Sequence, residues 1–225
     1  MPSKKPKKKP GPTQPHPGSR RRTPDQIIAA TRETLNIARR GLSDLQSGVG
    51  DQTIPGLYNV AVFGRAVTQG LNRLRNEVEG YDDWWASHMP GDDPLLLFFN
   101  KIRNSILKEV DVERKTTVVL NGTIDFNKIL SGPAPAGVTS IFVGEGSTGG
   151  SGWEVTLPDG TKEKYYAALH PDFGARVTLH LPDSPESHLG KTLEQTDAVS
   201  LARTYVGFLD RLVDDAETRF ITKKP

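Results

Sequence analysis

The sequence predicts an α+β fold, a four-helix bundle with a small antiparallel β-sheet inserted before the last helix. Two patterns indicate this class. Apolar residues recur every three or four positions in the first and last parts of the chain, which is the spacing of one buried helix face. The middle of the chain instead contains β-branched or alternating runs, which predict short strands. Helices, then strands, then one more helix are typical of an α+β arrangement.

Four segments are expected in chain order. They are a disordered, basic, Pro-rich tail over residues 1–22, the first three bundle helices over 23–113, the β insertion over 114–185, and the C-terminal bundle helix over 190–222. The last helix has no other apolar partner of sufficient length, so we expect it to pack back on the first three.

The first two helices have different start signals. Thr23 to Gln26 combine an N-cap threonine, a proline at the first helical position and a glutamine that closes a capping box, so the first helix begins there. A loop closed by Pro55-Gly56 is expected next. A second amphipathic helix then follows over 57–78, and its interior Gly64 and Gly70 suggest close contact with another helix.

Five strands are expected in the β insertion. The runs are separated by turn residues such as Asn121-Gly122. Trp153, Val155 and Leu157 share one side of a strand, so at least one sheet face is expected to be buried. The expected strands are 117–120, 138–143, 153–157, 161–166 and 176–181.

Composition excludes several classes of protein. The 225 residues include no cysteine, which excludes a disulfide framework, a thiolate zinc site and a cysteine nucleophile. No apolar run exceeds five residues, far below the roughly 20 that a membrane-spanning helix needs. The basic start of the chain lacks the apolar segment of a secretory signal. We therefore expect a soluble, cytoplasmic protein that needs no cofactor.

The net charge of +2 combines two opposite parts. Residues 1–22 contain five Lys, three Arg and no acid, whereas the rest of the chain contains 21 basic and 27 acidic side chains. Electrostatic affinity for RNA or DNA is therefore expected in the tail, the alternative being a solubilising leader. The candidate nucleic-acid-binding residues are Lys4, Lys5, Lys7, Lys8, Lys9, Arg20, Arg21 and Arg22.

Two other sets of residues predict no site. Residues 144–149 match G-x-G-x-x-G, but a dinucleotide site needs a helix after the motif and a strand is expected here, so the run is interpreted as a hairpin loop. The five histidines do not have the spacing of metal ligands, and no metal site is expected.

The third helix holds the candidate site. Asp93-Pro94 predicts its start, and it is expected to run to about residue 109. At 100° per residue, Arg103 lies on the same side of the helix as Leu96 and Leu107, between them along the axis, and beside the apolar arc that faces the core. A guanidinium between two leucines suits a partner surface or a buried carboxylate. Leu96, Arg103 and Leu107 are therefore the expected interface of a homodimer.

A purely structural role is the alternative for Arg103. It could form a salt bridge within its helix or with Glu77 or Glu79 on the preceding helix.

Residues 93–109 resemble the R-N-x-x-x-H helix of HEPN-domain proteins, which are bundles of four or five helices. Many members of that family are metal-independent ribonucleases of prokaryotic toxin and antiviral systems. Arg103 and Asn104 match the first two motif positions. The resemblance implies that the motifs of two subunits meet in a cleft at a dimer interface, where Arg103 would stabilise the scissile phosphate.

The sequence departs from the motif where the family has histidine, because Lys108 stands there. A histidine takes and gives a proton near neutral pH, whereas a lysine titrates near 10 and is a poor base unless burial lowers its pKa by about three. The candidate catalytic residues are Arg103, Asn104 and Lys108, in a helix that we expect to be catalytically inactive.

Three functions follow from these observations. The first is a non-enzymatic HEPN-like binding or regulatory module, dimeric through the third helix, whose tail contacts RNA or DNA. The second is a metal-independent ribonuclease of a toxin or antiviral defence system that uses the three candidate residues. The third is a scaffold whose β insertion docks a protein partner.

Overall fold

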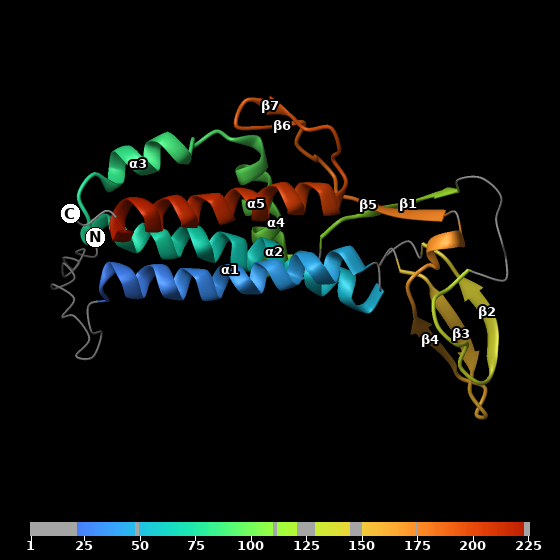
Figure 1. The fold of residues 1–225 in the computed structure, drawn as a ribbon. Coiled ribbons are helices and arrows are strands. Elements are labelled where there is room, and N and C mark those ends of the chain that lie inside the picture. Colours follow the sequence, from blue (N-terminus) through green and yellow to red (C-terminus); the bar gives the residue numbers. More distant parts are fainter. Residues whose placement is uncertain are drawn as a thin grey trace, which may run out of the picture.

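The computed structural model describes residues 22–47, 50–109, 112–120, 129–144, 150–173 and 175–222 (Figure 1). The fold is α+β, as the sequence predicts, with helices and small antiparallel sheets. Three expected features lie outside the described residues. They are the tail up to residue 21, the Asn121-Gly122 turn and the greater part of the glycine-rich run, residues 145–149.

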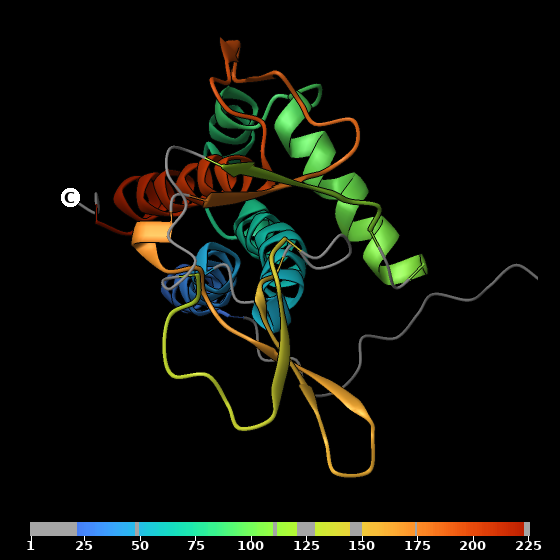
Figure 2. The same ribbon diagram turned by 90° about the vertical axis from the view of Figure 1, so that its right-hand side faces the viewer.

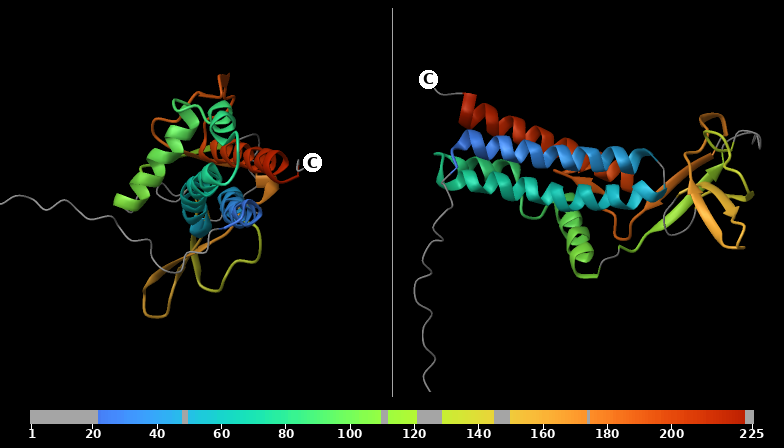
Figure 3. Two further views of the ribbon diagram at one scale, coloured as in Figure 1. Left: turned by 90° about the vertical axis from the view of Figure 1, so that its left-hand side faces the viewer. Right: turned by 90° about the horizontal axis from the view of Figure 1, so that it is seen from below.

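Three long helices form the body of the fold: α1 (Pro24–Ser47), α2 (Gly50–Leu71) and α5 (Ala198–Glu217). They lie side by side in Figures 1 and 3, and their inward faces share one core. The last helix packs on the earlier helices, which confirms that expectation. Core residues of these helices include Leu35, Ala38, Leu57, Val60, Val67, Leu201, Leu209 and Leu212.

The start of α1 has the predicted capping box. Thr23 Oγ1 accepts a hydrogen bond from the Gln26 N–H at 3.4 Å, and Gln26 Oε1 accepts one from the Thr23 N–H at 3.2 Å. These contacts satisfy two donors that the first turn of a helix leaves without partners.

Glycines bring α2 close to its neighbours. A methyl group added at Gly64 would lie 2.4 Å from Cε1 of Tyr205 in α5. One added at Gly70 would lie 2.6 Å from Oγ1 of Thr31 in α1. Both distances are too short for real side-chain contacts, which confirms the close helix–helix contact expected at these positions.

The loop expected at Pro55-Gly56 is wrong, because α2 begins at Gly50 and includes both residues. Gly56 is needed for contact with α1 rather than for a turn, since a methyl group there would lie 2.6 Å from the carbonyl oxygen of Gly41. Pro55 lies inside the second turn of α2, where its missing N–H removes one helical hydrogen bond.

Two shorter helices follow α2. It ends at Leu71, before the expected residue 78, and a 3₁₀ turn continues over Asn72–Asn76. α3 (Tyr81–His88) has no clear signal in the sequence and was not predicted. α4 (Pro94–Glu109) has the predicted bounds and crosses the bundle obliquely, packed on α2 (Figure 2). In the part of the chain that is described, no helix is both long and apolar enough to cross a membrane.

The strands form three separate antiparallel sheets instead of the single sheet expected. β1 (Lys115–Leu120) and β5 (Ala175–His180) pair as a two-stranded ribbon, and β6 (Ser187–His188) pairs with β7 (Lys191–Thr192). A three-stranded sheet lies beyond the end of the bundle in Figures 1 and 3. Its strands are consecutive in the chain, which favours pairing among themselves. They are β2 (Val138–Phe142), β3 (Gly152–Thr156) and β4 (Lys162–Tyr166).

Candidate functional site

The predicted site lies on α4, whose start is fixed by Asp93. The Asp93 carboxylate accepts a hydrogen bond from the Leu96 N–H at 3.0 Å, so Asp93 caps the helix as predicted. One side of α4 is buried in the core, through Leu95, Phe98, Phe99 and Ile102. The remaining side is called here the outer face of α4, and it carries Leu96, Leu97, Arg103, Asn104, Leu107 and Lys108.

The structure brings Arg103 and Asn104 together on the outer face, where both are half-buried. Arg103 Nη1 donates a hydrogen bond to Asn104 Oδ1 at 3.0 Å. Among the described residues Arg103 makes no ion pair, so the alternative salt bridge to Glu77 or Glu79 is wrong. The positive charge of Arg103 is therefore available to a ligand or a partner.

Lys108 lies one turn beyond Asn104 and is exposed. It lacks the burial that a lysine would need in order to act as a base near neutral pH. The position that is histidine in the R-N-x-x-x-H motif is thus occupied by a solvated cation, which can hold a phosphate but is poorly suited to proton transfer.

Leucines surround this polar pair. Leu96 is half-buried and packs against the core, whereas Leu107 is 56% exposed. Leu97, which the sequence analysis did not single out, is 53% exposed. These two leucines are the most exposed large apolar side chains in the described part of the chain. Leu97 was missed because it stands within an apolar run, although its rotation from Leu95 already places it away from the core.

The tail candidates are almost entirely outside the described residues, since Arg22 alone among the eight is described. Arg22 is exposed and lines a small open cleft between α1 and α2 together with Thr34, Gln69 and Arg73. The structure does not bring Arg22 to the outer face of α4.

A buried pair of His188 and Asp93 was missed by the sequence analysis. Nδ1 of His188 lies 3.0 and 3.1 Å from the two carboxylate oxygens of Asp93, and the Leu189 N–H donates to the same carboxylate at 2.6 Å. His188 is 6% exposed and its Nε2 has no hydrogen-bond partner. The pair joins the β6–β7 turn to the start of α4. No local signal could find it, because the two residues are 95 positions apart.

The environment of Asp93 stabilises its charged form. Burial alone would raise the pKa of this carboxyl group, but the hydrogen bonds from Leu189, His188 and Leu96 outweigh burial and hold the pKa below its ordinary value. An ionised Asp93 can only accept hydrogen bonds, so the Nδ1 atom of His188 carries the proton that they share.

A second histidine, His88 at the end of α3, lines an open cleft of about 380 Å³ over α5. Its Nε2 lies 3.5 Å from Oδ2 of Asp215, and the same oxygen accepts a 2.5 Å hydrogen bond from the indole N–H of buried Trp84. The cleft is lined by Ser87, His88, Leu189, Phe208, Arg211, Leu212 and Asp215. It combines an apolar floor with groups of both charges.

Ser87, His88 and Asp215 contact one another as the members of a hydrolase triad do, with Ser87 Oγ 3.0 Å from Nδ1 of His88, but their other bonds do not suit catalysis. Ser87 Oγ donates to the Trp84 carbonyl oxygen at 2.7 Å, and Nδ1 of His88 lies 2.9 Å from that same oxygen. A carbonyl can only accept, so this contact favours a proton on Nδ1 and leaves it unable to take the serine proton.

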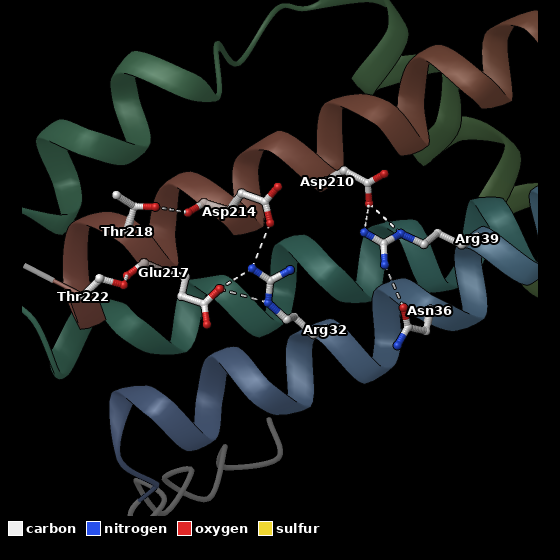
Figure 4. Close-up of polar contacts among 8 residues, drawn as sticks. All are labelled: Arg32, Asn36, Arg39, Asp210, Asp214, Glu217, Thr218 and Thr222. Carbon is white, nitrogen blue, oxygen red and sulfur yellow. Dashed lines mark hydrogen bonds and ion pairs between the residues drawn. The ribbon is translucent and has the colours of Figure 1, made fainter.

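Acids on the outer side of α5 are paired with arginines of α1 (Figure 4). Arg32 bonds to Asp214 at 2.8 Å and to Glu217, and Arg39 bonds to Asp210 at 2.9 Å. These acids are therefore neutralised within the bundle. No group of three or more His, Asp or Glu side chains suited to a metal ion occurs among the residues that the structure describes.

Comparison of the chain with protein-family models, curated proteins and solved structures finds no match. The site is therefore interpreted from its own geometry.

Proposed function

We propose that the chain is a non-enzymatic, HEPN-like binding module that works as a homodimer through the outer face of α4 and contacts nucleic acid through its basic tail. One observation carries the proposal. The two most exposed large apolar side chains of the described residues, Leu97 and Leu107, flank a half-buried arginine that has no acidic partner. Exposed apolar residues grouped around a half-buried polar pair are typical of an interaction surface.

A second copy of the same chain fits this face. Leu97 and Leu107 are ten positions apart, which is about 15 Å along the helix axis. Two α4 helices packed antiparallel about a two-fold axis near residue 102 would place Leu97 of each subunit opposite Leu107 of the other. Such a self-complementary contact is the usual geometry of a homodimer.

This arrangement would also place the two Arg103 side chains close to the axis. Like charges repel at such an approach unless an anion lies between them, and a guanidinium binds a phosphate through two parallel hydrogen bonds. A phosphate group of RNA or DNA is the anion that the proposal assigns to this position. The same arrangement supports the second candidate function, a metal-independent ribonuclease, although the exposed Lys108 argues against efficient proton transfer.

The tail supplies the second contact with nucleic acid. Residues 1–22 contain eight cations and no acid. Full engagement of eight charges with duplex DNA would give a slope of log K against log salt of about −7, and we expect roughly half of this value because a chain end seldom engages every charge at once. Binding of this kind has no sequence preference.

Sedimentation at about 100 µM tests the dimer. Wild-type protein should sediment at twice the mass of one chain, whereas the double variant Leu97→Lys and Leu107→Lys should sediment as a monomer with unchanged circular dichroism. Ile37→Lys is a matched control, since Ile37 is an exposed apolar residue on α1, and it should stay dimeric. A wild-type monomer at this concentration contradicts the proposed interface.

The two candidate functions are separated by incubation with a mixed RNA pool. A binding module leaves the RNA intact, and the salt dependence of its affinity gives the number of phosphate contacts. Degradation of the pool by clean protein, lost in Lys108→Ala, would instead establish the ribonuclease.

A further inference from the structure

The three-stranded sheet beyond the bundle exposes a row of apolar and aromatic side chains. Ile141, Trp153 and Tyr165 are direct cross-strand partners in the β2–β3–β4 register. Ile141 is 45% exposed, Tyr165 is 42% exposed and Trp153 is half-buried. Because neighbouring strands are about 4.8 Å apart, the row is a flat strip about 10 Å long. Together with Glu163 on β4 it is called here the Trp153 face.

The opposite side of this sheet has a different character, because side chains alternate between the two faces along each strand. Phe142 and Tyr166 meet edge to face at 5.3 Å, and Lys164 lies over the Phe142 ring. Lys162 forms a 2.7 Å ion pair with Glu154. Both lysines of β4 are therefore used on this second side.

The Trp153 face carries a single formal charge in these rows, that of Glu163. Glu163 lies opposite Val155, in the row next to that of Trp153, and its carboxylate accepts a 3.1 Å hydrogen bond from the Tyr165 hydroxyl. The face thus combines two aromatic rings, an isoleucine and one acid beside Val155. The burial expected on this side of β3 is complete at Val155 and only partial at Trp153. Over residues 129–144 and 150–173, two lysines stand against four acids, so the charge around the face is also negative.

We infer that the Trp153 face binds a Pro-rich, Lys-rich peptide segment, and that its occupant is the N-terminal segment of this chain, residues 2–12. Pro-rich segments dock on aromatic-lined surfaces because they are extended before binding and lose little conformational freedom. Their lysines interact with a nearby carboxylate and with the faces of aromatic rings. The inference does not rest on the dimer proposed for α4, but it competes with the nucleic-acid contact proposed for the tail, because the same lysines cannot engage both partners at once.

The composition of residues 2–12 matches both properties of the face. The segment alternates prolines with lysines and contains no acid. On this face, prolines of the segment would pack against the rings of Trp153 and Tyr165, and its lysines would lie beside Glu163. A nucleic acid fits the face less well, because Glu163 and the negative surroundings repel phosphates even though aromatic rings can stack on bases.

The length of the tail limits which of its residues can reach the sheet, and these are the residues near its start. α1 starts at the end of the bundle opposite the sheet (Figure 1) and is 24 residues long, or about 36 Å. An extended Pro-rich segment covers about 3.1 Å per residue, so about 12 residues are used in passing α1 alone. The residues left to reach the sheet are those near the start of the tail, where the lysines and prolines alternate.

The test titrates the full chain into a fluorescein-labelled peptide with the sequence of residues 1–14 and follows fluorescence anisotropy. Tyr165→Ala and Trp153→Ala should each weaken binding at least fivefold, and Glu163→Gln should weaken it about two- to fivefold at low salt. Tyr165→Phe keeps the ring, and Ser140→Ala alters the opposite side of the sheet, so both should bind within twofold of wild type. A peptide with alanine in place of its prolines should bind more weakly.

Competition by the chain's own tail provides a second measurement. A full-length variant with serine at the five tail lysines should bind the added peptide more tightly than wild type, because its own segment no longer occupies the face. The five substitutions are Lys4→Ser, Lys5→Ser, Lys7→Ser, Lys8→Ser and Lys9→Ser.

Three results would overturn the inference. The first is peptide binding that is unchanged in Tyr165→Ala and Glu163→Gln. Both positions are exposed, so these variants test the face even if Trp153→Ala misfolds, and their circular dichroism shows whether they are folded. The second is no effect of the five tail substitutions on the affinity for added peptide. The third is a single-stranded RNA oligonucleotide that binds through Trp153 and Tyr165 when the peptide does not, which would assign the face to nucleic acid.

Discussion

Replacing Asp93 by alanine should lower the free energy of unfolding by about 3 to 7 kcal/mol. The substitution removes the cap of α4, which contributes about 1 kcal/mol. It also leaves the Leu189 N–H and the buried ring of His188 without their acceptor, and each unpaired buried group costs about 1 to 3 kcal/mol. Because whole domains are stable by only about 5 to 15 kcal/mol, a loss of this size is easily measured.

Equilibrium urea unfolding followed by circular dichroism provides the assay. Asp92→Ala is the matched control, since Asp92 is the adjacent acid, is exposed and has no hydrogen bond or ion pair to any described residue. It should change the unfolding free energy by less than about 0.5 kcal/mol. Equal effects of the two substitutions, or a loss below 1 kcal/mol in Asp93→Ala, would refute the assignment of Asp93 as the joint between α4 and the β6–β7 turn.

The pH dependence of stability gives an independent check on the same group. The pKa of Asp93 is lower in the folded protein than in the unfolded chain, where a carboxyl of this type titrates near 3.9. Its contribution is therefore fully present above about pH 4 and is lost as the pH falls toward the lower folded pKa. Asp93→Asn should remove this part of the acid sensitivity, and an unchanged acid profile would contradict it.

Two further substitutions test the bundle. Gly64→Ala should destabilise the protein by about 1 to 3 kcal/mol in the urea assay, because the added methyl group would collide with the buried ring of Tyr205. Alanine is ordinarily the better helix former, so a stabilised variant would show that this contact can relax. Arg32→Ala removes the ion pairs to Asp214 and Glu217. Because these pairs are partly exposed, the substitution should lower the free energy of unfolding by at most about 1 kcal/mol, and by less in 1 M salt. A loss that persists in 1 M salt would mean that packing of the Arg32 side chain matters instead.

Local signals predicted the features that depend on neighbouring residues. The capping box at Thr23 and the cap at Asp93 were found because a few adjacent residues determine them. The loop predicted at Pro55-Gly56 was wrong because glycine occurs both in turns and at close contacts between helices. Only the position of Gly41 in the fold distinguishes the two cases.

Features that depend on distant residues were not predicted. His188 pairs with a residue 95 positions earlier, and its own neighbours contain no trace of this contact. On α4, Arg103 and Asn104 were found from a short motif, but their relation to Leu97 depends on which side of the helix the core covers. Likewise, the five expected strands were placed nearly correctly, whereas their division into two sheets depends on the whole insertion, and the short β6–β7 pair was not predicted.

The position of α5 has a consequence for how the chain folds during synthesis. α1 and α2 are adjacent in sequence and can pair as soon as both have left the ribosome, but the apolar sides that they turn toward α5 stay uncovered until the last helix emerges, about 130 residues later. At 5 to 20 residues per second this interval lasts about 6 to 25 s. For that period the helical pair presents an apolar surface to chaperones and to other nascent chains, so the step at which the protein is most prone to aggregate is set by the order of its elements along the chain.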